Sequence, residues 1–306
     1  MAARIARVKA MLPSLESALQ AFTSSSISFR VIKTIPAASS SAVDIDHAGS
    51  RIAADPRTLF ILDSSYNPPS RAHVALASAT ISTSSEARPY RLLLLFSTHN
   101  ADKAPSPASF TQRLAMMILS AEDLQMASPT DMRVPIDIGL TTAPYYTDKS
   151  RAIMTQEPVA YPSQPTHVHL LGYDTLIRFL APKYYKGYDP PLSALAPFFD
   201  VGHKLLVLLR PDSSSDNAVT SEPIEAQRAF IEKLAEGSLA GEGMQPAWAH
   251  QIGLLEGPAV NEAVGISSSA IRKAVREHDW TSVERMCTPG VVEWIKDQKL
   301  YSSDDR

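Results

Sequence analysis

The sequence has almost no cysteine and no long hydrophobic run. Cys287 is the single cysteine among 306 residues, so no disulfide can form within the chain, and a reducing compartment is the natural setting. The most apolar stretches, 92–96 and 205–209, have the length of β-strands and are too short to cross a membrane. These absences exclude a disulfide-stabilised fold and predict no membrane association.

An excess of positive charge is also missing. The chain carries 29 Lys and Arg against 32 Asp and Glu, a formal net charge of −3. Binding to bulk nucleic acid normally needs a basic face, so this class of function is not favoured. A small anionic ligand needs only a local positive pocket. The length is sufficient for one large α/β domain or two small ones, and a homo-oligomer is compatible with it.

The first 41 residues allow two interpretations. They carry basic residues, many serines and a single acidic residue, Glu16, a composition typical of a mitochondrial transit peptide. The same stretch fits a helix with apolar residues at helical spacing, followed by a strand at 28–35. We favour the helix and strand, because transit peptides rarely contain a segment as strand-like as 29–32. Cytoplasm, nucleus and mitochondrion all stay open as compartments.

From Thr58 onward, strand-sized apolar runs alternate with helical patterns. Continuous runs such as 92–95 are typical of strands that are covered on both faces. The alternation predicts a Rossmann-like α/β fold, a doubly wound parallel sheet with helices on both faces. The predicted strands are 59–62, 91–96, 132–138, 167–172, 204–209 and 251–255, and the predicted helices are 72–81, 110–126, 175–180 and 224–235.

The turn after the first of these strands is the most informative segment. Pro68 and Pro69 keep it out of helical conformation, and Ser70 is the predicted N-cap of the helix that follows. His73 then lies in the first helical turn, beside unpaired backbone N–H groups that attract phosphate. A charged imidazole there would stabilise an α-phosphate, but the position alone is equally compatible with a histidine that only decorates a helix start.

Residues 65–73, Ser-Tyr-Asn-Pro-Pro-Ser-Arg-Ala-His, resemble the nucleotidyltransferase signature G-[ST]-[FY]-[DN]-P-x-H-x-G-H. Further segments resemble that superfamily's motifs in the same order, namely 100–103 with 112–116, 145–147, 171–176, 209–211 and 266–272. The whole pattern is most similar to the nicotinamide mononucleotide adenylyltransferase family, in its fungal cytidylyltransferase-like branch. The chain then divides into an N-terminal helix–strand extension and linker (1–57) and a nucleotidyltransferase domain (58–306).

The resemblance implies transfer of AMP from ATP to nicotinamide mononucleotide, which yields NAD and pyrophosphate, with Mg²⁺ arriving on the ATP phosphates. No covalent intermediate is needed, so the protein would act by positioning and charge stabilisation. The implied catalytic residues are His73, Arg272 and Lys103. The implied ATP-binding residues are Ser65, Tyr66, Ser70, Gly172, Asp174, Arg210, Ser267, Ser268, Ser269 and Arg272. The implied acceptor-nucleotide residues are Lys103, Tyr146 and Thr147.

Several of these residues also have a purely structural interpretation. Asp174 could cap the helix predicted at 175–180 rather than bind ribose, and the serines at 267–269 could cap a surface helix. His167 and His169 lie on a predicted strand, where we expect them to point to opposite faces. No metal site formed by protein side chains is therefore predicted.

Two departures from the family pattern bear on activity. Ser70 replaces the first histidine of the signature, and serine brings no positive charge. The three tryptophans, at 248, 280 and 294, all lie late in the chain, although the family commonly stacks nicotinamide on tryptophan. The aromatic residues that could stack instead are Tyr145, Tyr146, Phe179, Tyr184 and Tyr185. Two alternatives stay open: a nucleotide-binding regulatory protein with weak or no catalysis, and cytidylyl transfer to another phosphorylated acceptor.

Overall fold

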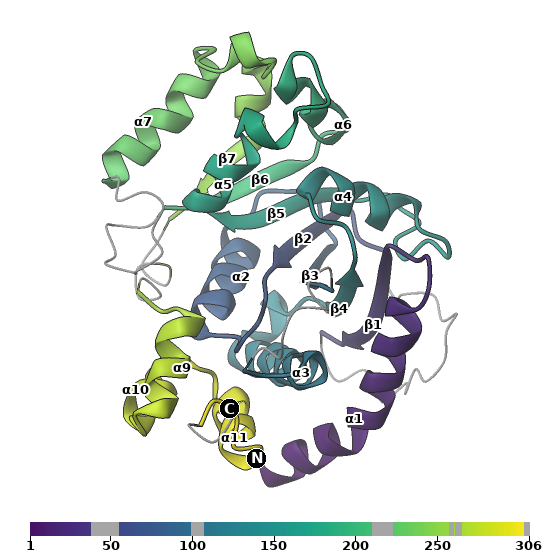
Figure 1. The fold of residues 1–306 in the computed structure, drawn as a ribbon, viewed down its shortest axis with the longest axis vertical. Helices are drawn as coiled ribbons and strands as arrows, with labels where there is room; N and C mark the ends of the chain where they lie inside the picture. Colours follow the sequence, from purple (N-terminus) through teal and green to yellow (C-terminus); the bar gives the residue numbers. More distant parts are fainter. Residues whose placement is uncertain (38–54, 99–106, 210–222, 257–259, 261–264, 303–306) are drawn as a thin grey trace.

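A seven-stranded sheet forms the centre of the molecule. The computed structural model describes residues 1–37, 55–98, 107–209, 223–256, 260 and 265–302 (Figure 1). The strand order is β1-β4-β3-β2-β5-β6-β7, in which β1 is antiparallel to β4 and all other pairs are parallel. The strands are β1 (Phe29–Ile35), β2 (Thr58–Asp63), β3 (Tyr90–Ser97), β4 (Ile136–Thr141), β5 (Thr166–Gly172), β6 (Lys204–Leu208) and β7 (Ile252–Leu255). The predicted Rossmann-like α/β class is confirmed.

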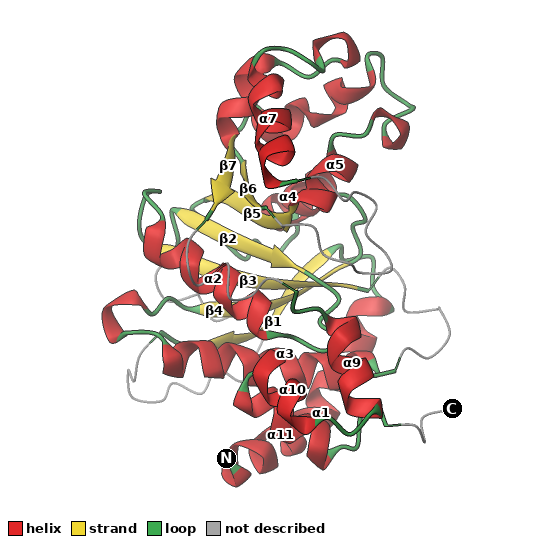
Figure 2. Cartoon of the chain, turned by 90° about the vertical axis from the view of Figure 1, so that its left-hand side faces the viewer, coloured by secondary structure: helices red, strands yellow, loops and turns green. Residues whose placement is uncertain are grey.

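Helices cover both faces of the sheet. The longer ones are α1 (Ala2–Thr23), α2 (Arg71–Thr83), α3 (Phe110–Ala127), α4 (Tyr146–Thr155), α7 (Ile224–Ala235), α9 (Ser268–Arg276) and α11 (Pro289–Asp297), and the shorter ones are α5 (Tyr173–Phe179), α6 (Ala196–Phe199) and α10 (Trp280–Met286). Alternate residues of β2 point to opposite faces, so Phe60 and Leu62 pack with α2 and α3, whereas Leu59 and Ile61 pack with α4. Figure 2 shows α2 and α3 on one side of the sheet, with α1, α10 and α11 gathered beside α3.

The N-terminal segment is part of this core. Helix α1 buries Ile5, Val8, Leu15 and Phe22 in the same cluster as α3 and α11, and β1 pairs with β4 at the edge of the sheet. The helix and strand favoured for the first 35 residues are therefore confirmed. We still propose the division of the chain at residue 57. It separates two segments along the sequence, and these segments share one core.

Several element predictions were wrong in detail, and helices α10 and α11 were not predicted. Strand β4 begins at Ile136 and not at 132, because Pro135 has no N–H for the ladder and residues 130–132 form a short 3-10 turn. Helix α4 was not predicted. The apolar residues that it buries are Ala152 and Ile153, and these two adjacent residues give no amphipathic repeat along the helix. Within the described residues, no helix has both the length and the apolar character needed to span a bilayer.

Candidate functional site

The turn between β2 and α2 lies at the carboxyl edge of the sheet, where the strand order reverses between β2 and β5. Open α/β sheets bind ligands at such a switch point. Tyr66 occupies the left-handed region, with φ of 46°, and its buried hydroxyl donates to the Leu62 carbonyl. Ser70 has an extended backbone and is the N-cap of α2, as predicted. The turn is therefore fixed at both ends.

His73 is turned back onto this turn. Its Nδ1 accepts the Ser70 backbone N–H at 3.0 Å and lies 2.8 Å from Ser70 Oγ, while its Nε2 lies 2.9 Å from Ser64 Oγ. A backbone N–H can only donate, so Nδ1 carries no proton here and the ring is neutral, with its proton on Nε2. Ser70 and His73 thus form a reciprocal capping box at the start of α2.

The start of α9 packs directly against the same turn. Ser267 caps α9 by accepting the Ala270 N–H at 3.1 Å. Ser268 Oγ donates to the Pro68 carbonyl at 2.8 Å, although the two residues are 200 positions apart. Arg272 donates to the Asn67 carbonyl at 2.7 Å and to Ser269 Oγ at 3.2 Å. The N-termini of α2 and α9 are therefore brought together at this edge of the sheet.

Two further residues complete the turn. The Tyr301 hydroxyl donates to Asn67 Oδ1 at 2.8 Å, and burial raises the pKa of this phenol. At the end of β2, Lys149 of α4 donates to the carboxylate of Asp63 in a buried ion pair. Sequence reasoning missed both Tyr301 and Lys149. Nothing in the local pattern marks them, because each partner lies far away in the sequence.

Gly172 and Asp174 lie at the end of β5, the neighbour of β2 on the other side of the switch point. Gly172 is the N-cap of α5, and Asp174 lies in the first turn of that helix. The interpretation of Asp174 as an N-cap is therefore wrong. A role in binding ribose stays a proposal.

No protein-family model matches the chain. A Schizosaccharomyces pombe protein named "Putative nicotinamide mononucleotide adenylyltransferase" is 28% identical over 248 residues, which cover 80% of this chain and 87% of the yeast protein. The chain is thus similar, over most of its own length and most of the relative's length, to a protein that carries the name of the family its motifs resemble.

Two solved structures of one Plasmodium falciparum protein are also similar. The nicotinic acid mononucleotide adenylyltransferase complexed with NaAD has a TM-score of 0.48 at 14% identity, and its complex with APC has a TM-score of 0.45. Each likeness covers 80% of this chain and 97% of the Plasmodium chain.

Two residues that the family resemblance assigns to the site, Lys103 and Arg210, lie outside the described residues. Among the described ones, Ser65 is exposed, and Tyr146 and Thr147 begin α4. Tyr146 packs edge-to-face on Phe179, with ring centroids 6.1 Å apart. Burial and the Asp63 carboxylate raise the pKa of the Tyr146 hydroxyl.

Other aromatic side chains divide between core and surface. Trp248 stacks on Phe199, and Trp294 donates to Gln112, so both are core residues. Tyr185 is buried, whereas Tyr145 and Tyr184 are exposed. Among the aromatic residues named from the sequence, Tyr146 lies at the start of α4 and is neither fully buried nor fully exposed.

The prediction that His167 and His169 point to opposite faces was wrong. Residues two apart on a strand share a face, and these rings lie 6.3 Å apart with His203 stacked on His167 at 4.2 Å. Desolvation lowers the pKa of all three imidazoles, to about 4 for His203. Stacked rings do not aim their lone pairs at one point. Across the described parts of the chain, no three His, Cys, Asp or Glu side chains are arranged to hold a metal.

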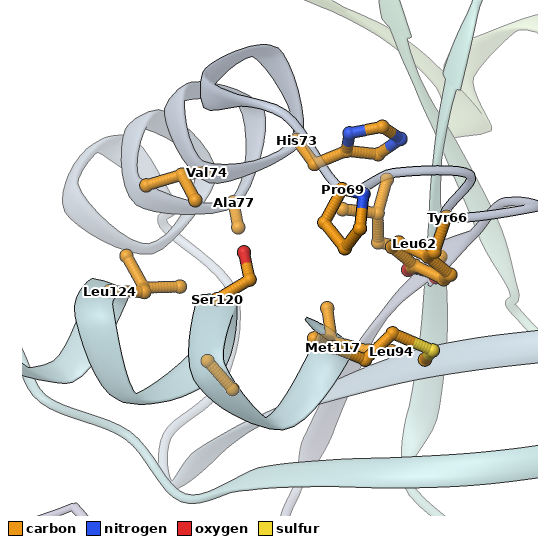
Figure 3. A pocket seen from close by; sticks show the side chains of 11 residues that line it. Leu62, Tyr66, Pro69, His73, Val74, Ala77, Leu94, Met117, Ser120 and Leu124 are labelled. Atoms are coloured by element: carbon orange, nitrogen blue, oxygen red, sulfur yellow. Dashed lines mark hydrogen bonds between the residues drawn. The ribbon is translucent and has the colours of Figure 1, made fainter. Parts of the chain in front are cut away.

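A small pocket lies behind the turn, between α2 and α3 (Figure 3). Leu62, Val74, Met117 and Leu124 contribute to a lining that is mostly apolar, and His73 stands at its edge. None of the lining residues is Lys or Arg. This pocket is therefore unsuited to a triphosphate, which needs the N–H groups and cations of the two helix starts.

Proposed function

We propose that this protein transfers AMP from ATP to nicotinamide mononucleotide. A phosphate oxygen of the mononucleotide attacks the α-phosphorus of ATP, the α–β anhydride bond breaks, and pyrophosphate leaves as NAD forms. The observation that supports this proposal best is the meeting of the α2 and α9 N-termini at the turn after β2, with Arg272 beside them. Two helix N-termini and a guanidinium favour the binding of an extended anion such as a triphosphate.

Catalysis would come from placement and charge, since the reaction needs no covalent enzyme intermediate. Arg272 would hold the outer phosphates and His73 the α-phosphate. Mg²⁺ bound to the phosphates would neutralise part of their charge. The carboxylate at the turn, Asp63, is already paired with Lys149. The magnesium ion would therefore be held by the ATP phosphates and not by a protein carboxylate.

The direct test is an incubation of purified protein with ATP, Mg²⁺ and nicotinamide mononucleotide, followed by measurement of NAD. We expect NAD and pyrophosphate in equal amounts, and neither when the mononucleotide is omitted. A parallel panel with CTP and phosphorylated alcohols, scored by pyrophosphate release, tests cytidylyl transfer. Pyrophosphate release with another pair and no NAD would replace this proposal by that transfer.

A second candidate function is nucleotide binding without efficient turnover. Ser70 supports it, because this residue stands where the family signature has a histidine and its hydroxyl is engaged with His73. Loss of one preorganised donor in an active site typically costs about 10²- to 10³-fold in rate. We expect Ser70→His to raise the rate of NAD formation by at least roughly tenfold, a partial recovery of such a loss.

Ser70→Ala is the matched control for this substitution, since it keeps the backbone N–H that His73 accepts. Ser70 is buried, so the melting temperature of both variants must be measured alongside the rate. A folded Ser70→His protein with an unchanged rate would show that this position does not limit turnover.

A further inference from the structure

The ion pair between Asp63 and Lys149 lies where the two proposed substrate regions meet. Asp63 is the last residue of β2 and precedes Ser64, whose hydroxyl contacts His73 on the ATP side. Lys149 lies one turn into α4, the helix that begins with the acceptor-side residues Tyr146 and Thr147. One contact therefore joins the ATP turn to the acceptor segment.

Burial makes this pair costly. The side chains of Lys149 and Asp63 are 6% and 10% exposed. Removing two charges from water costs free energy that their attraction often fails to recover, and an apolar pair of similar size is often as stable or more stable. The Lys149 ammonium also lies 5.2 Å from the centroid of the Tyr146 ring. Stability alone gives little reason for this arrangement.

Electrostatics at the edge of the sheet supplies a reason. A carboxylate at the end of β2 lies beside the start of α2, where a triphosphate would bind by our proposal. Like charges in a partly buried site repel strongly, because little solvent screens them. Lys149 cancels the charge of Asp63 and leaves the positive field of the helix starts available to the ligand.

We propose that Lys149 is a positioning residue that neutralises Asp63, and so keeps this edge of the sheet open to a nucleoside triphosphate, while it fixes the start of α4 against the turn. This inference rests on the proposed function for the identity of the ligand. It predicts an asymmetry between the two partners. Loss of the lysine leaves an unpaired carboxylate that repels the phosphates. Loss of the carboxylate leaves no negative charge to repel them.

The test measures the affinity for a non-hydrolysable ATP analogue with Mg²⁺ by calorimetry, in the absence of any acceptor. The proteins are the wild type, Lys149→Met, Asp63→Asn and the double variant. We expect Lys149→Met to weaken binding by about tenfold or more, in line with a close like-charge contact. Asp63→Asn should bind at least as tightly as the wild type, and the double variant should return to within about threefold of it.

Lys204→Met is the matched control. Lys204 begins β6 and pairs with Glu86 at the opposite end of the sheet, so its loss should leave the affinity for the analogue unchanged. Melting temperatures separate folding from binding, and Lys149→Gln serves if Lys149→Met does not fold. Equal weakening by both single variants, with no recovery in the double variant, would make the pair merely structural.

The outcome is independent of catalysis. If the wild type binds the analogue but forms no NAD, the proposed transfer fails while the asymmetry can still be measured. If the wild type binds no nucleoside triphosphate, both proposals fail.

Discussion

Toward the residues that the structure describes, Arg272 uses only part of its donor capacity. It donates to the Asn67 carbonyl and to Ser269 Oγ, and a guanidinium has five N–H groups in a fixed fork. The contacts hold the side chain across the turn, so it meets a ligand with little loss of rotational freedom. Neighbouring Lys273 is exposed and pairs only loosely with Glu277, at 3.9 Å.

Replacement of Arg272 by alanine should therefore weaken ATP binding by roughly 1.5–3 kcal/mol, the range for a hydrogen bond to a charged group. Calorimetry with a non-hydrolysable analogue measures this. Lys273→Ala, on the same helix, should leave the affinity unchanged. If Arg272→Ala melts early yet binds the analogue normally, the arginine serves only to hold the turn.

Single residues differ in how far the sequence could predict them. Ser70 as an N-cap follows from the prolines before it, and its place in the structure confirms this. Tyr301 meets Asn67 across 234 positions, and Lys149 meets Asp63 across 86. No local pattern encodes such pairs, because they depend on which strand ends become neighbours.

At the scale of elements, too, local features such as helix caps could be predicted, whereas long-range features could not. The serines at 267–269 indicated a helix start, and Ser267 caps α9. Helix α4 escaped prediction because half of its buried residues are polar: Lys149 and Ser150 are buried beside Ala152 and Ile153. Apolar spacing identifies helices that pack on a core, and not helices that bury charged side chains at a site.

The capping box of α2 gives a prediction that separates stability from chemistry. His73→Ala removes the acceptor for the Ser70 N–H and should lower the free energy of unfolding by about 1 kcal/mol, as the loss of a cap does. His73→Gln can keep the box, since glutamine is favoured at this helical position. We expect both variants to lose turnover, and only His73→Ala to lose stability in urea unfolding.

The two variants of His73 therefore distinguish two roles. Equal turnover in His73→Gln and the wild type would limit the histidine to capping. A loss of turnover in His73→Gln at unchanged stability would assign the imidazole a part in the reaction.

At the scale of the whole molecule, the sequence predicted the parallel sheet but not its antiparallel edge. The alternation of strands and helices from Thr58 onward requires crossovers and hence parallel pairing. Strand β1 joins β4 in the opposite direction, and the buried carboxylate of Asp137 accepts from Thr34 of that strand at 2.6 Å. That edge depends on contacts across 103 positions.

The fold creates the proposed site by bringing distant segments to one edge. Strand β2 leads into the turn, β5 lies beside it, α4 contributes Lys149, and the chain returns near its end to place α9 against Pro68. The N-terminal helix stabilises the far side of α3, where Arg4 pairs with Glu122 and Asp123. The site thus depends on the complete sheet and not on one motif.

A crystal of this protein soaked with a non-hydrolysable ATP analogue and nicotinamide mononucleotide tests the central claim most directly. The account predicts difference density for a triphosphate between the starts of α2 and α9, within hydrogen-bond reach of Arg272, and for a second nucleotide toward the start of α4. Density for the triphosphate elsewhere, with the turn after β2 bare, would contradict it.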